Sequence, residues 1–186
     1  MRVGGKPLLR IAAELGHRDI CELLVEQGAD VNETMGVRKH SILHNAVSRS
    51  DYGTSSILLD LGADPNVKAS NEATPLQFAA RSGQVYLAAK LLNHGAKVDG
   101  QDNQGRSALH WAAEKSDFDM VKFLLKHNCD ANLADRRGRT PLSIAFANGS
   151  HEIAELLEKY GGKYPESKHA RRLSKVAEAK SQPRQM

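Results

Sequence analysis

Apolar and polar positions along this chain follow one pattern that returns every 33 or 34 residues. Each copy opens with a short apolar stretch, continues through a polar turn, and ends with a second apolar stretch that carries a Leu-Leu pair. The pattern predicts a helix–turn–helix unit that occurs five times. The copies begin at Pro7, Ser41, Thr74, Ser107 and Thr140.

Residues that favour helix ends mark each predicted unit. Ser or Thr starts the first helix in four of the five copies, where its hydroxyl can cap free backbone N–H groups. Pro75 and Pro141 follow at a position where the missing N–H donor has no cost. Paired alanines such as Ala79-Ala80 let the second helix approach closely. The second helix ends at residues suited to a left-handed C-cap, which are Gly28, Gly62, Gly95, Asn128 and Gly161.

The Leu-Leu pairs of the second helices are the predicted core. We expect both members of each pair to face the interior of the stack. The pairs are Leu23-Leu24, Leu58-Leu59, Leu91-Leu92, Leu124-Leu125 and Leu156-Leu157.

Through "TPLQFAA", "ALHWAA", "GADVN" and the "LLxxGAD" spacing, the chain resembles the ankyrin-repeat family over about residues 4–162. The resemblance implies an all-α, ankyrin-type solenoid of stacked helix–turn–helix repeats joined by β-hairpin-like fingers. Neighbouring repeats of such a stack bury one another's apolar faces. We expect one repeat domain over residues 1–162, with repeats at about 4–34, 35–68, 69–101, 102–134 and 135–162.

Three copies depart from the family pattern, and the fifth does so through Ala145-Phe146 in place of an Ala pair. The first has Pro7-Leu8 in place of Thr-Pro, and it places Leu8, Leu9, Ile11 and Leu15 on or near an open end of the stack. The chain is therefore a fragment of a longer repeat array, or a partner covers this end, or the end frays. The second copy has Val47 in place of Ala and the polar stretch "SRSDYGTSS", so we expect it to be the least stable.

The net charge of +4 comes from the C-terminal tail. From Lys163 onward seven basic residues stand against two acidic ones, which leaves 19 basic and 20 acidic residues before that position. The tail, residues 163–186, is predicted to be disordered or to form a short helix on the last repeat. The chain has no apolar run near the roughly 20 residues of a membrane span, and no signal-peptide core. We expect a soluble protein of the cytoplasm, with the nucleus as the alternative.

Residues that could carry catalysis or bind a metal are assigned structural roles. His44 and His110 occupy the His position of the family's Thr-Pro-Leu-His motif, where a side chain can hydrogen-bond to backbone groups of the turns. Cys21 and Cys129 are too far apart for a disulfide and are expected to pack as small apolar residues. Phosphate-loop, nucleophile-elbow and zinc-site motifs are missing from the sequence. We expect no enzymatic activity, no cofactor and no bound metal.

Recognition of a protein partner is the predicted function. The resemblance places binding in the groove formed by the fingers and the exposed side of the first helices. Arginine and tryptophan are enriched at binding hot spots, so we expect a partner with an acidic segment and an apolar anchor. The predicted contact residues are Phe78, Arg81, Arg106, Trp111, Lys115, Arg136, Arg137 and Arg139. In the alternative interpretation these arginines are solvated and paired with Asp102, Asp135 and Glu114.

Two further hypotheses concern the tail and the finger turns. The basic tail could associate with nucleic acid or an anionic membrane, with the repeats as a structural spacer. The resemblance also implies possible hydroxylation of the Asn that closes "GADVN", which is Asn32, Asn66 or Asn132. The alternative role of these asparagines is to close the finger turn through their side chains.

Overall fold

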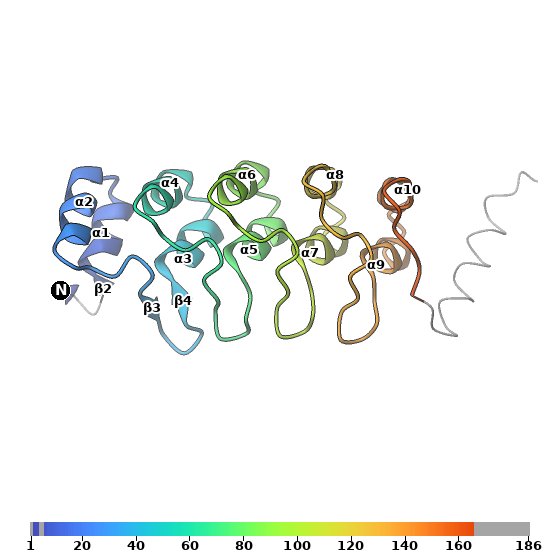
Figure 1. Ribbon diagram of the computed structural model, residues 1–186, viewed down its shortest axis with the longest axis horizontal. Coiled ribbons are helices and arrows are strands. Elements are labelled where there is room, and N and C mark those ends of the chain that lie inside the picture. Colours follow the sequence, from blue (N-terminus) through green and yellow to red (C-terminus); the bar gives the residue numbers. More distant parts are fainter. Residues whose placement is uncertain (1, 4–5, 166–186) are drawn as a thin grey trace, which may run out of the picture.

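Five helix pairs stack side by side in a row in the computed structural model, which describes residues 2–3 and 6–165 (Figure 1). The first helices of the pairs form one layer and the second helices form the other. The connecting fingers protrude beyond the layer of first helices (Figure 1). This arrangement confirms the predicted all-α solenoid of helix–turn–helix units.

All described helices are short. The first helices have seven residues each and are α1 (Leu8–Glu14), α3 (Ile42–Ser48), α5 (Pro75–Arg81), α7 (Ala108–Glu114) and α9 (Pro141–Ala147). The second helices have nine residues each and are α2 (Arg18–Glu26), α4 (Tyr52–Asp60), α6 (Val85–Asn93), α8 (Phe118–Lys126) and α10 (His151–Lys159). Isolated helices of this length are marginal in water, so each one depends on its neighbours.

Two of the fingers form antiparallel hairpins. The first is β1 (Arg2–Val3) with β2 (Lys6–Pro7), and the second is β3 (Thr34–Met35) with β4 (His40–Ser41). Backbone hydrogen bonds also join successive finger tips, from the N–H of Ser70 to the carbonyl of Arg38 and from the N–H of Asn103 to that of Asn71. The fingers therefore form a continuous edge along the stack.

The core runs through all five repeats between the two layers. The paired alanines of the first helices are buried, and Ala79 and Ala80 are fully so, which lets the helices approach closely. Burial of one leucine side chain stabilises a fold by about 2 kcal/mol. The central leucines of the later second helices are fully buried, and these are Leu58, Leu91, Leu124 and Leu157.

The prediction was wrong for Leu23, which is 55 % exposed. Counted from the glycine of the turn, Leu24 rather than Leu23 aligns with the central leucines Leu91 and Leu124. Leu23 aligns with Lys90 and Phe123, which lie on the side of the second helix next to the preceding repeat. A Leu-Leu pair therefore does not have the same register in every copy.

The predicted helix ends are confirmed. Four first helices begin with a capping box, in which the first residue and the third helical residue cap each other's backbone N–H. These pairs are Ser41 with His44, Thr74 with Gln77, Ser107 with His110, and Thr140 with Ser143. The second helices are followed by residues of positive φ, which are Gly28, Gly62, Gly95, Asn128 and Gly161.

In three repeats the third residue of the capping box also holds the next finger. Nε2 of His44 lies 3.1 Å from the carbonyl oxygen of Ala73, and Nε2 of His110 lies 3.0 Å from that of Arg139. Gln77 occupies the same position and its Nε2 donates to the carbonyl of Arg106 at 2.6 Å. In each case the carbonyl lies 29 residues further along the chain. One side chain thus caps its own helix and sets the distance to the next repeat.

The structural role predicted for the two histidines is confirmed by these contacts. Nδ1 of His44 accepts the backbone N–H of Ser41 at 3.2 Å, so the ring proton lies on Nε2 and is donated to Ala73. Burial disfavours the charged ring and lowers the pKa of His44 to about 4, and it also lowers the pKa of His110.

Acidification should therefore destabilise the fold before most carboxylates titrate. In the unfolded chain His44 becomes protonated below its ordinary pKa of 6.5. In the folded chain the same ring stays neutral down to about pH 4. The free energy of unfolding should fall by up to about 1.4 kcal/mol per pH unit across this window because of His44. Urea titrations at pH 7.5, 6 and 5 measure the slope. His44→Gln, which copies the side chain of Gln77, should flatten it, and an unchanged slope would contradict the assignment.

The second repeat contains an unsatisfied polar atom. Ser55 on α4 is fully buried, and its Oγ is the one buried side-chain oxygen or nitrogen without a hydrogen-bond partner in the described residues. Its neighbour Thr54 is satisfied, because its hydroxyl lies 2.9 Å from the carbonyl oxygen of Ala13. Other repeats place Ala88 and Val121 at the position of Ser55. The lower stability of the second repeat remains a prediction.

Ser55→Ala should raise the free energy of unfolding by about 1 kcal/mol. The substitution removes an unsatisfied buried hydroxyl and introduces a better helix former. Thr54→Ala is the matched control, and it should lower the free energy of unfolding because it removes a hydroxyl that is bonded across the repeat interface. Urea denaturation of the two variants separates these effects, and destabilisation by Ser55→Ala would show that the hydroxyl has a partner.

The predicted tail lies almost wholly outside the described residues. Its first three residues, 163–165, are described, and Lys163 and Tyr164 contact the last two repeats. The backbone N–H of Lys163 donates to Oδ1 of Asn132 at 2.8 Å, and the hydroxyl of Thr140 donates to the carbonyl of Lys163 at 3.0 Å. The ring of Tyr164 packs edge-on against Phe146.

Candidate protein-binding surface

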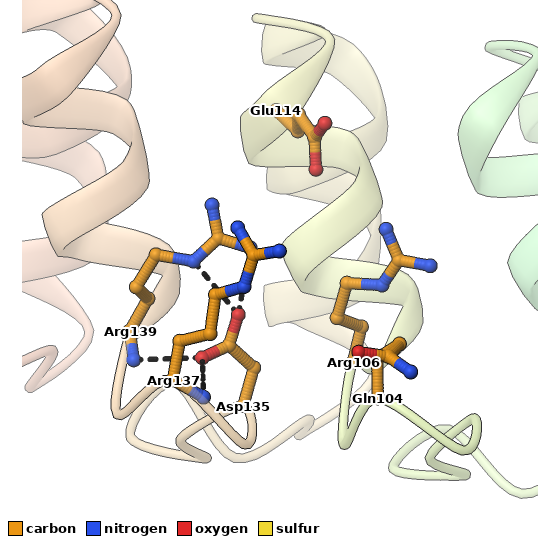
Figure 2. Close-up of a pocket in the computed structure, with 6 residues that line it drawn as sticks. All are labelled: Gln104, Arg106, Glu114, Asp135, Arg137 and Arg139. Carbon is orange, nitrogen blue, oxygen red and sulfur yellow. Dashed lines mark hydrogen bonds and ion pairs between the residues drawn. The ribbon is translucent and has the colours of Figure 1, made fainter.

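A small pocket lies between the last two fingers, residues 101–106 and 134–139, next to α7 (Figure 2). Its volume is about 200 Å³. The lining side chains are predominantly charged, and they are Gln104, Arg106, Glu114, Asp135, Arg137 and Arg139. We call it the arginine pocket.

Asp135 organises the finger that forms one wall of the arginine pocket. Oδ1 accepts the backbone N–H groups of Arg137 and Arg139, both at 2.9 Å, and Oδ2 accepts Nε and Nη2 of Arg139 at 2.8 and 2.7 Å (Figure 2). Burial by itself would raise the pKa of Asp135, but the hydrogen bonds from Arg139 and Arg137 lower it below its ordinary value. The buried carboxylate thus fixes both the turn and the Arg139 side chain.

The preceding finger repeats the same construction. Oδ1 of Asp102 accepts the backbone N–H groups of Gln104 and Arg106, and Oδ2 lies 3.1 Å from Nε and 3.0 Å from Nη2 of Arg106. The shared sequence signal is Asp-x-x-Gly-Arg, which occurs in "DNQGR" and "DRRGR". Gly105 and Gly138 have φ near +75°, a conformation that side chains oppose.

Trp111 supports Arg106 from a second direction. The Cζ of Arg106 lies 3.8 Å from the centroid of the half-buried indole, and the Cζ of Arg81 lies 5.1 Å from it. A guanidinium over an indole gains cation–π attraction. The indole therefore contacts an arginine of its own finger and one of the preceding repeat, and Arg106 is held at its edge by Asp102 and at its face by Trp111.

The structure brings together three of the predicted contact residues, Arg106, Arg137 and Arg139, in the arginine pocket. Arg81 and Trp111 adjoin them through Arg106. The remaining predicted residues lie elsewhere, with Arg136 and Lys115 exposed outside the pocket lining. Phe78 contacts the rings of His40 and His44, with centroids 5.2 and 5.1 Å away.

The alternative interpretation is confirmed for two of the arginines. Arg106 and Arg139 pair with Asp102 and Asp135, while Glu114 pairs with neither of them. The side chain of Arg137 makes no ion pair within the described part of the chain. The ligand-binding role of all eight residues stays a prediction. Sequence reasoning named the two aspartates as partners of the arginines but missed that each also accepts two backbone N–H groups of its finger, although the spacing repeated in both fingers carried that signal.

The asparagines proposed for hydroxylation bridge neighbouring repeats. Asn66 accepts the backbone N–H of Lys97 at 2.7 Å and donates to the carbonyl of Gly95 at 3.0 Å. Asn132 holds Lys163 and Gly161 in the same way, and Asn32 accepts the N–H of Asp64. These bonds give the asparagines a structural role, and hydroxylation remains a prediction.

Other candidate chemistry is limited in the described residues. Burial raises the pKa of the Cys129 thiol to about 12 and also raises the pKa of Cys21, which makes both poor nucleophiles at neutral pH. Residues 2–3 and 6–165 contain no cluster of three or more His, Cys, Asp or Glu side chains that could hold a metal ion. None of their helices is long and apolar enough to cross a membrane.

Known protein families include one whose repeat pattern matches that of this chain. The family model for ankyrin repeats, which contains three copies, matches residues 9–102, 43–135 and 76–168. The chain belongs to the ankyrin-repeat family. Ankyrin repeats are generally non-enzymatic protein–protein interaction modules.

Ankyrin-repeat proteins from distant organisms are similar to parts of the chain. An ankyrin repeat-containing protein of Treponema pallidum is 33 % identical over 103 residues, which is 55 % of this chain and 35 % of the relative. Ankyrin repeat and SOCS box protein 14 of Mus musculus is 40 % identical over 96 residues, or 47 % of this chain and 16 % of the relative. The matched region is therefore a minor part of each relative.

Asp135→Asn should lower the free energy of unfolding by about 1–2 kcal/mol. The amide oxygen can still accept the two backbone N–H groups, but the charge that binds Arg139 is lost. Glu114→Gln is the matched control, because the side chain of Glu114 lines the same pocket without a hydrogen bond or ion pair in the described structure. It should change stability by less than about 0.5 kcal/mol in the same urea titration. Equal effects of the two substitutions would exclude an organising role for Asp135.

Proposed function

We propose that this ankyrin-repeat chain is an adaptor, scaffold or inhibitor that binds an acidic segment of a protein partner at the arginine pocket. The observation that supports the proposal is the convergence of three arginines, Arg106, Arg137 and Arg139, on one small pocket at the finger edge. The fingers and the exposed side of the first helices would extend the contact along the stack.

Two of the arginines are already held in place for binding. Asp102 and Asp135 engage Nε and Nη2 of Arg106 and Arg139, which leaves the Nη1 groups without a hydrogen bond in the described structure. Less side-chain entropy is lost when an ordered guanidinium binds a carboxylate. Arg137 adds a positive charge that has no carboxylate partner of its own within the described residues.

The size of the arginine pocket favours a side chain over a small molecule. Sites for cofactors and drug-sized ligands commonly have volumes of roughly 300–1,000 Å³ with apolar walls. About 200 Å³ with a charged lining instead suits one or two carboxylates of a peptide. Trp111, half-buried beside Arg106, offers the neighbouring apolar contact for the partner's anchor.

Fluorescence of Trp111, the one tryptophan in the sequence, provides a direct test. The intact chain is titrated with peptides rich in Asp and Glu that carry one aromatic residue. Arg137→Ala should raise the dissociation constant about tenfold, since a hot-spot arginine contributes at least about 1.4 kcal/mol to the binding free energy. Arg136→Ala, on the same finger but outside the pocket lining, is the matched control and should change the constant less than about twofold.

Three outcomes would count against the proposal. Equal losses for Arg136→Ala and Arg137→Ala would indicate general attraction to the basic finger. Unchanged binding in both variants would place the site elsewhere. Association that disappears when residues 166–186 are deleted, and that falls steeply with salt, would favour the alternative of nucleic-acid or membrane attachment through the tail.

A further inference from the structure

The first repeat exposes an apolar face on the side away from the rest of the stack. Ile20 and Leu23 on α2 are 48 % and 55 % exposed, and Leu15 at the end of α1 is 65 % exposed. We call this the N-side face. Large apolar side chains gathered on one surface of a soluble domain commonly mark an interaction site.

The other repeats show what this face is built to contact. Ile20 aligns with a residue that is at most 3 % exposed in every later repeat, and these residues are Thr54, Leu87, Met120 and Ile153. The last repeat has a described helix pair only before it, and it buries Ile153. The first repeat has a helix pair only after it, and it exposes Ile20. This position therefore packs against the preceding repeat.

Leu15 and Leu23 also occupy positions that contact the preceding repeat in later copies. Leu23 aligns with Leu156, which is partly buried in the last repeat. Leu15 aligns with Asn148, whose side chain donates to the carbonyl oxygens of Ala113 and Glu114 in the preceding repeat. All three residues of the N-side face thus lie where later repeats contact the helix pair before them.

The opposite side of the stack is built differently. Phe146 stands at the position of the fully buried Ala80 and Ala113, where small side chains let the next first helix approach. The ring of Tyr164 covers Phe146 edge-on, with centroids 5.9 Å apart. Oδ1 of Asn132 accepts the backbone N–H of Lys163, as Oδ1 of Asn66 accepts that of Lys97 between two earlier repeats. The last repeat therefore presents a large aromatic ring at a position where the third and fourth repeats have alanine.

We propose that the N-side face is a docking site for one further helix pair of the ankyrin type, stacked in register on α1 and α2. The surface continues the series of repeat–repeat interfaces, so the occupant it fits has small residues on its first helix and leucines on its second. A head-to-tail copy of this chain does not meet that requirement, because its last first helix, α9, carries the large Phe146 where small residues are needed. The inference is independent of the arginine pocket.

The test adds a repeat whose stacking surface is known. A copy of residues 74–101, joined directly to Arg2, reproduces the 33-residue spacing between Thr74 and Ser107 at the first repeat. The extended chain should unfold in one transition, with a Tm at least about 4 °C above that of the unextended chain. The same segment joined behind Met186 controls for added length and should leave the Tm unchanged.

Substitutions on the face identify the contact. The double variant Ile20→Lys with Leu23→Lys should abolish the gain in Tm of the extended chain. Because both side chains are exposed without the extension, the same variant of the unextended chain should keep its Tm within about 1 °C. Val37→Lys, at a finger tip that is 97 % exposed, is the matched control and should preserve the gain.

Two results would overturn the proposal. The first is an extended chain without a higher Tm, or with a gain that survives the double lysine variant. The second is a dimer of the unextended chain in sedimentation that dissociates in the double variant, which would assign the face to a second copy joined face to face.

Discussion

The hydrogen bond from the third residue of a first helix to the last residue of the next finger holds the second to fifth repeats in register. Helices of seven and nine residues have little stability of their own, and the apolar contacts between repeats are not directional. His44, Gln77 and His110 supply the direction, because each caps one helix while binding a backbone carbonyl 29 residues later. The second to fifth repeats are thereby placed at one spacing. Asparagine bonds such as that from the N–H of Lys97 to Asn66 add a second constraint beside the second helices.

The same bonds position the candidate binding surface. His110 binds the carbonyl of Arg139, and Gln77 binds that of Arg106, so each clamp holds the arginine that closes a finger. Within the finger, Asp135 or Asp102 fixes the arginine side chain. A recognition surface on loops is usually adaptable, whereas these two arginines are connected to the core by an unbroken chain of hydrogen bonds. The binding geometry and the repeat spacing therefore depend on the same residues.

The two sides of the stack differ for a reason that lies in single side chains. The second, third and fourth repeats bury Val47, Ala80 and Ala113 where the next first helix approaches, whereas the last repeat has the larger Phe146 at this position. The first repeat keeps aliphatic residues, Ile20 and Leu23, where interior repeats bury theirs. The stack consequently has an aromatic pair, Phe146 and Tyr164, at one end and exposed aliphatic side chains on α2 at the other.

The sequence by itself determined the repeat unit, the helix ends and the solenoid, because these depend on residues near one another in the chain. Thr74 caps the helix that contains Pro75 and Gln77, and Gly95 ends the next one, whatever surrounds them. The sequence also indicated the arginines that line the candidate site. The pairing of Arg106 with Asp102 is also local, whereas only the tertiary structure placed Arg106 against Trp111 and its carbonyl in the clamp of Gln77. The exposure of Leu23 and the packing of Phe78 against His40 likewise depend on contacts between repeats, which a pattern of similar copies cannot distinguish.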